Sequence, residues 1–263
     1  MQRTKWYRSI WISDVHLGTR RCKADALLDF LRRHQAETLY LVGDIVDGWN
    51  FGPTWHWSAA QTAVVHELAA WRLRGTKIIF LPGNHDEGSL SLVETLFGNV
   101  SIKTEVVHRT GDGRRLLVTH GHQFDTAIAN GRWMSALGAY RMMSRLDEWY
   151  RAVAPERERN VRLAGYLKGS VRKAVDRFTS ADRPEFKRAL LQAVREFKVD
   201  GVVCGHIHQP AQCMIEGVSY NNDGDWVENC TALAEDRDGE LRLLHWTPAF
   251  NDIAVTPPIE RRI

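Results

Sequence analysis

The sequence predicts an α/β protein in which sheets and helices form layers around a shared core. The first observation behind this fold class is that short apolar runs alternate with segments of helical apolar spacing. The expected strands of the first half are residues 10–12, 38–42 and 77–81. The expected helices around them are residues 23–35, 58–74 and 89–97. Such alternation is typical of sheets covered by helices.

A hairpin pattern is the second observation. Val106-Val107 and the run 116–118 flank Gly111-Asp112-Gly113, which is a Gly and Asp turn between two β-rich runs. The third observation is the apolar strand 201–204, which follows some 80 residues later. The segment in between has apolar residues at helical spacing. Beyond Pro210, short strand patterns alternate with turns expected at 221–224 and 238–239. The second half therefore adds a strand-rich part to the layered first half.

Length and composition narrow the class of protein. A chain of 263 residues with 44% hydrophobic and 25% charged residues can bury a full core, as one large domain or two small ones. No run approaches the ~20 apolar residues of a membrane helix. No apolar segment follows the basic first residues, so we expect no signal peptide and a cytoplasmic location. The four scattered cysteines indicate reduced thiols.

Charge is unevenly distributed along the chain. Residues 126–198 contain 16 Lys and Arg against 8 Asp and Glu, a net charge of +8, whereas the remainder carries −5. A basic insert on a mildly acidic body suggests contact with an anionic partner, although on charge alone a solvated helical face is the preferred explanation.

Polar residues follow directly after each apolar strand of the predicted core. They fall in five short segments: Asp14-Val15-His16, Gly43–Asp47, Gly83–Asp86, His120-Gly121-His122 and Gly205–His208. Ligands of open α/β sheets bind at the carboxyl ends of strands, so these segments are expected to converge. Together they hold four Asp, one Asn and six His, a set that would be costly to bury without a cation. Oxygen and imidazole ligands without thiolates suit Mn, Fe, Zn or Ni.

In this order the five segments resemble the motif set of the calcineurin-like metallophosphoesterase superfamily. The resemblance covers residues 10–246 and leaves 126–198 as an insertion. It implies a sandwich of two mixed β-sheets flanked by helices, the metallophosphoesterase fold. It also implies a single domain over residues 1–263, with residues 126–198 forming an inserted helical lid.

The resemblance also implies a two-metal site and its ligands. The implied ligands are Asp14, His16 and His208 for one metal, Asn84, His120 and His206 for the other, and Asp44 as the bridge. Two divalent ions held by one shared carboxylate suit in-line attack of water on phosphorus. Mn is the expected metal, with Fe, Zn and Ni as alternatives.

Further residues near the ligands have implied or open roles. The resemblance implies that His85 is a catalytic residue, which either contacts phosphate or protonates the leaving oxygen. It implies that Asp47 is a catalytic carboxylate that orients His85. Asn84 is also implied to contact phosphate. Asp86 is expected to be a turn or cap residue. His122 matches no ligand position and is expected to support a ligand or contact substrate. Asp125 is expected to contact substrate or orient His120.

Within the superfamily, the chain looks like the UDP-2,3-diacylglucosamine hydrolases of lipid A synthesis. Three segments of the sequence support this narrower resemblance: residues 11–20, the interposed lid, and residues 220–232. The substrate implied is UDP-2,3-diacylglucosamine, cleaved to UMP and the acylated glucosamine 1-phosphate. The lid's apolar stripe and its cations Lys168, Arg172 and Lys173 would suit acyl chains and a diphosphate. Core packing is the stronger explanation of the apolar stripe.

The chain departs from the narrower family at three motifs. Known diacylglucosamine hydrolases tend to have GDxFE, GNRD and HGD, whereas this chain has GDIVD, GNHD and HGH. An alternative substrate, another nucleotide or a small phosphoester, therefore stays open for a phosphodiesterase or phosphatase. A lipid substrate would bring peripheral contact with the cytoplasmic face of the inner membrane. No nucleic-acid partner is expected, and oligomeric state cannot be inferred. The tryptophans at 49, 55 and 57 could border the substrate, touch the membrane or pack internally.

Overall fold

In the computed structural model, strands and helices are described for most of the chain outside the predicted lid. The described residues are 4–50, 52, 55–86, 89–98, 100–124, 184–247 and 254–255. The chain divides into two compact units, residues 1–122 with 190–263, and residues 123–189. The lid predicted at 126–198 therefore lies largely outside the described residues, except for its last helix. Among the described residues, no helix has the length and apolar character needed to cross a bilayer.

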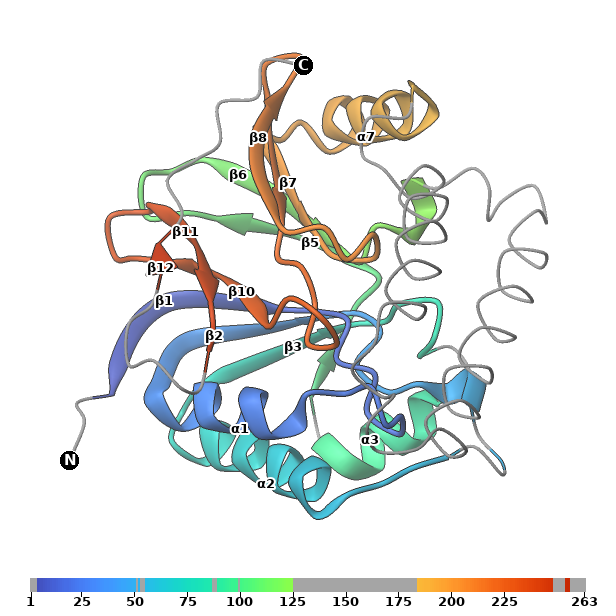
Figure 1. The fold of residues 1–263 in the computed structure, drawn as a ribbon. Helices are drawn as coiled ribbons and strands as arrows, with labels where there is room; N and C mark the ends of the chain where they lie inside the picture. Colours follow the sequence, from blue (N-terminus) through green and yellow to red (C-terminus); the bar gives the residue numbers. More distant parts are fainter. Residues whose placement is uncertain are drawn as a thin grey trace, which may run out of the picture. The chain divides into compact units, whose positions relative to one another are not determined.

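The larger unit contains two mixed β-sheets (Figure 1). The seven-stranded sheet has the order β12-β11-β10-β1-β2-β3-β4. Its strands are β1 (Lys5–Ile12), β2 (His34–Val42), β3 (Lys77–Leu81), β4 (Ser101–Ile102), β10 (Thr231–Glu235), β11 (Leu241–His245) and β12 (Ala254–Val255). β1 to β4 run parallel, and β10 pairs antiparallel with β1. The expectation of mixed sheets is confirmed.

The five-stranded sheet has the order β5-β6-β7-β9-β8. Its strands are β5 (Glu105–Arg109), β6 (Arg115–Thr119), β7 (Gly201–Cys204), β8 (Ala211–Ile215) and β9 (Val218–Asn222). β5 and β6 form the predicted hairpin, whereas β6, β7 and β9 run parallel. The turn expected at 221–224 begins later, because Asn221 and Asn222 pair with Gln212 and Ala211 of β8.

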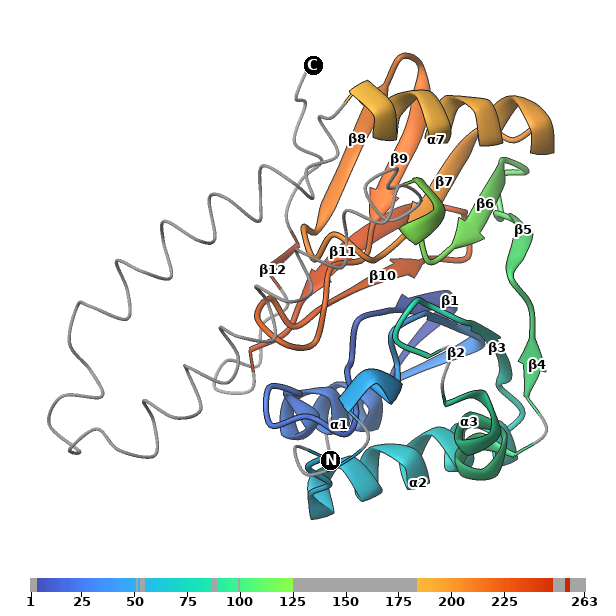
Figure 2. The ribbon, with the colours of Figure 1, turned by 90° about the vertical axis from the view of Figure 1, so that its right-hand side faces the viewer.

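Four helices are described beside the sheets: α1 (Ala24–Arg33), α2 (Ala59–Leu73), α3 (Leu90–Phe97) and α7 (Pro184–Phe197). The first three cover one face of the seven-stranded sheet (Figure 1). From Leu190 onward, α7 runs along the outer side of the five-stranded sheet (Figure 2). α2 begins where predicted, because the Ser58 hydroxyl accepts a hydrogen bond from the Gln61 N–H at 3.2 Å. α1 ends before His34, whose extended backbone starts β2.

Two apolar layers hold the larger unit together. Between the sheets, Trp11 and Tyr40 of the seven-stranded sheet pack with Val118 and Val203 of the five-stranded sheet. The second layer lies between the seven-stranded sheet and its helices and includes the fully buried Trp71. Because β1, β2 and β3 are parallel, their carboxyl ends share one edge, where the predicted site residues follow.

Candidate metal centre

The loops that follow β1 and β2 are joined by backbone hydrogen bonds beyond the ends of both strands. The Asp14 N–H donates to the Gly43 carbonyl at 3.0 Å, and the His16 N–H donates to the Asp44 carbonyl at 2.9 Å. Leu17 then pairs with Val46 in an isolated parallel bridge. This continued pairing fixes the carboxylates of the two loops side by side at the edge of the sheet.

Five candidate ligands occupy the left-handed region of backbone conformation. These residues are Asp14 (φ 52°), His16 (φ 52°), Asp44 (φ 53°), His206 (φ 69°) and His208 (φ 53°). A side chain in this region costs about 1 kcal/mol, and such strain concentrates at functional sites. The backbone therefore turns sharply at the residues that the sequence marks as ligands.

Close backbone approach explains the glycines that precede three of these segments. A Cβ added at Gly43 would overlap His120, one at Gly83 would overlap Asp44, and one at Gly205 would overlap Ser13. Only a residue without a side chain leaves room for these neighbours.

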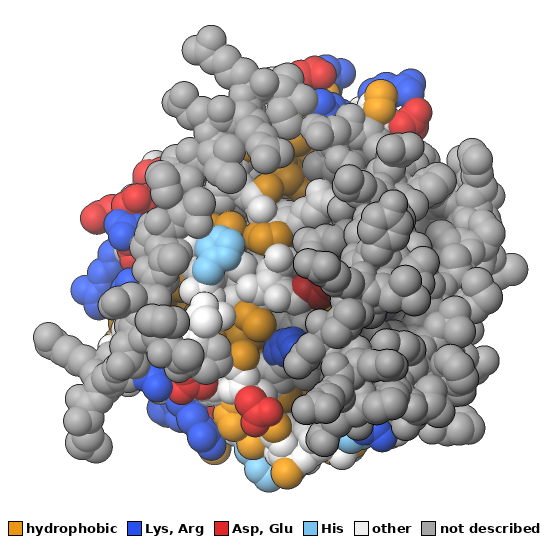
Figure 3. All heavy atoms as spheres, viewed as in Figure 1, with side chains coloured by type: hydrophobic (Ala, Val, Ile, Leu, Met, Phe, Trp, Pro, Cys, Tyr) orange, Lys and Arg blue, Asp and Glu red, His pale blue; other side chains and the backbone are white. Residues whose placement is uncertain are grey.

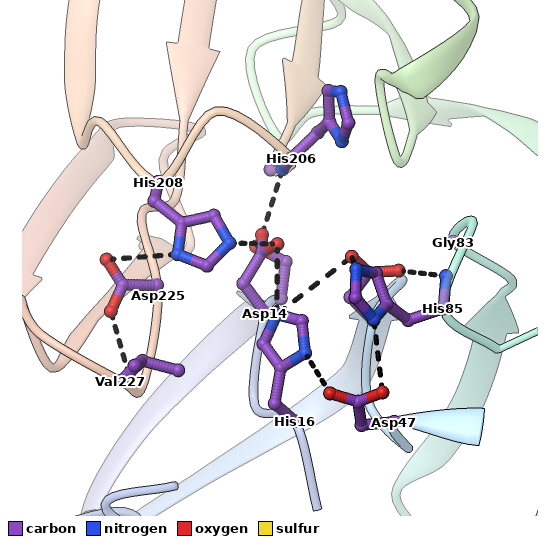
Figure 4. Close-up of polar contacts among 12 residues, drawn as sticks. Asp14, His16, Asp47, Gly83, His85, His206, His208, Asp225 and Val227 are labelled. Atoms are coloured by element: carbon purple, nitrogen blue, oxygen red, sulfur yellow. Dashed lines mark hydrogen bonds and ion pairs between the residues drawn. The ribbon is translucent and has the colours of Figure 1, made fainter. Parts of the chain in front are cut away.

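The first group of donors consists of Asp14, His16 and His208, which come from the loops after β1 and β7 (Figure 4). His208 Nε2 lies 3.0 Å from Asp14 Oδ1, and His16 Nε2 lies 4.0 Å from the same oxygen. His16 Nε2 is also 4.0 Å from Asp44 Oδ2. Asp14 is fully buried and His16 nearly so, whereas the side chain of His208 is 34% exposed.

Asp44, His120 and His206 form the second group. Asn84 is buried between Gly83, where a Cβ would overlap Asp44, and His85, whose backbone N–H donates to Asp44 Oδ1 at 2.8 Å. His120 Nε2 lies 3.4 Å from Asp44 Oδ2. The ring is oriented from its other side, because His120 Nδ1 is 2.8 Å from the Val42 carbonyl oxygen. Asp125, the residue expected to orient this ring, lies outside the described residues, and the Val42 carbonyl takes that position.

Asp47 contacts two imidazoles at once (Figure 4). Its Oδ1 lies 3.2 Å from His85 Nδ1, and its Oδ2 lies 3.5 Å from His16 Nδ1, a contact that the sequence analysis did not include. Burial alone would raise the pKa of Asp47, but hydrogen bonds from both imidazoles hold that pKa far below its ordinary value. His85 Nε2 is left 3.9 Å from Asp44 Oδ2. One carboxylate therefore orients both a candidate ligand and the candidate acid.

The donor atoms fit a pair of divalent cations. Among the described residues, His16 Nε2, Asn84 Oδ1 and His120 Nε2 are buried without a hydrogen-bond partner. A buried polar atom without a partner costs about 1–3 kcal/mol, and two bound cations would satisfy all three. The set contains carboxylate, amide and imidazole groups and no thiolate, which is the chemistry that Mn, Fe, Zn and Ni accept.

Electrostatics lead to the same conclusion. Burial would raise the pKa of Asp44, but His120, His85 and His16 hold that pKa well below its ordinary value. Burial would likewise lower the pKa of His120, yet Asp44 raises it to about 10. The centre therefore stabilises positive charge, which a proton supplies when no metal is bound.

A family comparison identifies the fold and its chemistry. The model of calcineurin-like phosphoesterases matches residues 7–210. The chain belongs to this family. It is a metallophosphoesterase, a hydrolase of phosphoesters, and its buried His and Asp clusters are consistent with a dinuclear metal site.

Two curated relatives of this phosphoesterase have the same name. A UDP-2,3-diacylglucosamine hydrolase of Bordetella pertussis is 29% identical over 216 residues, which cover 77% of this chain and 78% of the relative. A protein of the same name from Cellvibrio japonicus is 25% identical and covers 90% of this chain and 98% of the relative.

Solved structures of low identity also resemble the chain. Vps29 of Entamoeba histolytica, as a single-residue variant, has a TM-score of 0.46 and 15% identity, covering 94% of this chain and 96% of that one. An archaeal phosphodiesterase has a TM-score of 0.45 and 15% identity, covering 90% and 98%.

Residues beside the ligands are placed as follows. Asp86 accepts hydrogen bonds from the N–H groups of Gly83 at 2.9 Å and Val46 at 2.8 Å, so the turn role expected for it is confirmed. The His122 ring centroid lies 5.5 Å from that of His120, and burial together with the neighbouring histidines lowers the His122 pKa to about 4. Its contact with substrate stays a prediction. Lys168, Arg172 and Lys173 lie outside the described residues, as does Asp125.

Trp49 packs directly on the candidate acid, with ring centroids of Trp49 and His85 3.7 Å apart. Trp55 and Trp57 stack on each other at 5.6 Å, and Trp55 lies against Gly18. These contacts favour internal packing for the pair, whereas Trp49 borders the centre. In the view of Figure 3, a small patch of His atoms is exposed beside hydrophobic side chains.

Three buried side chains near the centre were not predicted as site residues: Ser13, Asp223 and Asp225. Ser13 Oγ contacts Asp14, and Asp225 Oδ2 lies 3.9 Å from His208 Nδ1 (Figure 4). The two aspartates could have been predicted from the same pattern as the other site residues, because they are polar residues that follow a strand. It was missed because residues 221–224 were expected to form a turn, whereas β9 runs to Asn222.

Proposed function

We propose that this phosphoesterase hydrolyses a phosphoanhydride at two divalent cations, with Mn as the expected metal. Asp14, His16 and His208 would hold one cation and Asn84, His120 and His206 the other, with Asp44 shared between the two groups. When bound, two cations acidify a water and stabilise negative charge on phosphoryl oxygens. The observation that carries this proposal is the convergence of buried, partly unpaired donors from five strand-end loops on one place.

In this proposal His85 acts as the general acid for the leaving oxygen. Its Nδ1 faces Asp47 at 3.2 Å, which leaves Nε2 as the atom available for proton donation. Burial lowers the pKa of His85, but Asp44 and Asp47 raise it above its ordinary value. A protonated imidazole whose ring is fixed by a carboxylate is suited to hand a proton to an oxyanion. Trp49 would keep water from the ring face that it covers.

We propose UDP-2,3-diacylglucosamine as the substrate, cleaved to UMP and the acylated glucosamine 1-phosphate. The printed name shared by the relatives supports this choice, over 77% to 90% of the chain. Peripheral contact with the cytoplasmic face of the inner membrane follows from a substrate with two acyl chains. His85, where the known hydrolases tend to have Arg, favours the second candidate, a diesterase or phosphatase acting on another nucleotide or small phosphoester.

The proposal is tested by incubating the purified full chain with Mn²⁺ and UDP-2,3-diacylglucosamine in detergent and measuring UMP release. Bis-p-nitrophenyl phosphate, run in parallel, reports hydrolysis of a simple diester. UMP release that depends on Mn²⁺ is the expected result. Turnover of the simple diester without UMP release under Mn, Fe, Zn or Ni would exclude the lipid substrate and favour the second candidate. Turnover of neither compound would contradict both.

A further inference from the structure

Ser13 lies between two buried carboxyl groups in this phosphoesterase. Its Oγ is 2.6 Å from Asp14 Oδ2 and 2.6 Å from Asp223 Oδ1, and the Gly224 carbonyl is 3.2 Å away. All three side chains are at most 1% exposed. A hydroxyl carries one proton, so it can donate to only one of the two carboxyl groups. The second short contact therefore requires a proton on one of the carboxyl groups.

The other contacts of the two carboxyl groups decide which one carries that proton. Asp14 Oδ2 also accepts a hydrogen bond from the backbone N–H of His206 at 2.9 Å, and Asp14 Oδ1 lies 3.0 Å from His208 Nε2 in its imidazole ring. Asp14 Oδ1 and Asp223 Oδ2 are both buried without a hydrogen-bond partner among the described residues, but of the two only Asp14 Oδ1 lies within ion-pair distance of an imidazole. Donors thus surround Asp14, as an ionised carboxylate requires, and a neutral acid fits Asp223. Burial also raises the pKa of Asp223 well above its ordinary value.

We propose that Ser13 and Asp223 are positioning residues for the candidate ligand Asp14. The Asp223 carboxylic acid donates to Ser13 Oγ, and the Ser13 hydroxyl donates to Asp14 Oδ2. This order holds one oxygen of Asp14 in place and leaves the other, Oδ1, facing His16 and His208. The inference rests on the proposed two-metal centre and adds a supporting pair from the loops after β1 and β9.

The backbone around this pair is locked to the neighbouring loop. The Asp223 N–H donates to the Cys204 carbonyl at 3.0 Å, and the Asn222 side-chain amide donates to the Gly205 carbonyl at 2.6 Å. A Cβ at Gly205 would overlap both Ser13 and Asp14. The loops after β1, β7 and β9 thus meet at the Ser13 hydroxyl. If the Asp223 carboxyl group were removed, no other side chain could move into its place without disturbing these loops.

Asparagine at position 223 separates the proposed role from plain packing. An Asn side chain has the shape of a protonated Asp, and its N–H can donate to Ser13 in the same direction. We expect Asp223→Asn to keep the Mn²⁺ affinity of the wild type within about 3-fold. Asp223→Ala removes the donor, and we expect it to weaken binding at one of the two sites by about 10–100-fold, as is typical for groups that support a ligand.

Ser13→Ala provides a second, smaller change on the same path, and we expect it to weaken the same site. Its matched control is Ser9→Ala, which removes another buried serine of the same chain segment, on β1, and should leave Mn²⁺ affinity unchanged. The measurement is a titration of the metal-stripped full chain with Mn²⁺, followed by the electron paramagnetic resonance signal of free Mn²⁺. Circular dichroism establishes that each variant is folded.

The outcomes separate the inference from the function it rests on. If the wild type binds no Mn²⁺, the two-metal proposal fails. If the wild type binds two and Ser13→Ala and Asp223→Ala bind with unchanged affinity, the positioning role is overturned. If Asp223→Asn weakens binding as much as Asp223→Ala, the order of donors is wrong. If Asp223→Ala does not fold, Ser13→Ala against Ser9→Ala decides.

Discussion

At the scale of single residues, Asp44 is the side chain on which the two groups of donors converge. Its Oδ2 lies 3.4 Å from His120 Nε2, 4.0 Å from His16 Nε2 and 3.9 Å from His85 Nε2. We predict that Asp44→Asn abolishes paired metal binding and lowers kcat by about 10³-fold or more, because one shared negative charge is lost. Elemental analysis of the purified variant and a turnover assay measure the two effects. Near-normal turnover would exclude the bridging role.

His85 should behave differently from Asp44. We predict that His85→Asn lowers kcat by about 10²–10⁴-fold while both metals are retained, because a proton donor is lost and no ligand is removed. The acidic group should also disappear from the pH dependence of kcat. Asp47→Asn is the informative partner, since Asp47 contacts His16 as well, and it should reduce both turnover and metal affinity. Loss of metal in His85→Asn would instead make His85 a ligand.

The candidate ligands and His85 could be predicted from the residue types at strand ends, because each motif that contains them is contiguous in sequence. The left-handed backbone at Asp14, His16 and Asp44 was not predictable, since L-residues with a Cβ rarely adopt it and only the folded loops impose it. The second contact of Asp47 was missed for a related reason. Contacts between residues 31 positions apart, such as Asp47 and His16, depend on how two loops pair.

At the scale of elements, the junction of α1 and β2 contains a buried histidine. His34 is 2% exposed, its Nδ1 lies 2.8 Å from the Phe30 carbonyl, and its ring stacks on Phe30. Burial lowers the pKa of His34 to about 4. The unfolded chain therefore binds a proton between about pH 6.5 and 4 that the folded chain does not bind, so stability falls as the pH falls through this window.

We predict that His34 lowers the free energy of unfolding by about 2 kcal/mol at pH 5 relative to pH 7. His34→Gln cannot be protonated, so its melting temperature should fall less between pH 7 and pH 5 than that of the wild type. His66→Gln, at an exposed position of α2, is the matched control and should show the wild-type fall. An equal fall in all three proteins would refute the assignment to His34.

Strand and helix positions were largely predictable from periodicity, and 77–81 and 201–204 agree with β3 and β7. The early parts of β1 and β2 were missed, because the apolar residues there are few: Trp6 and Tyr7 in one strand and Ala36 in the other. Lys5 and His34 pair at the start of the two strands. Such pairing is decided by the neighbouring strand and not by local sequence.

At the scale of the whole larger unit, one imidazole connects the two sheets. His108 of β5 lies 2.9 Å from the Tyr40 hydroxyl through Nδ1 and 2.8 Å from Glu235 Oε2 through Nε2, and both partners belong to the seven-stranded sheet. Trp11 meets the His108 ring edge to face at 5.1 Å. The connection is buried, so leaving its partners without His108 is costly.

We predict that His108→Leu lowers the free energy of unfolding by about 3 kcal/mol, because Tyr40 and Glu235 lose a buried partner. Val107→Ala, on the same strand and 37% exposed, is the control and should change it by less than about 0.5 kcal/mol. Urea unfolding measures both values. Equal stabilities of the two variants would show that the sheets do not depend on this connection.

We expect two cations to occupy the centre formed by these loops. Crystals of the full chain grown with Mn²⁺, measured on both sides of the manganese absorption edge, test it most directly. We predict two anomalous peaks, one at Asp14, His16 and His208 and one at Asn84, His120 and His206, with Asp44 contacting both. A single peak, or manganese bound elsewhere, would contradict the account.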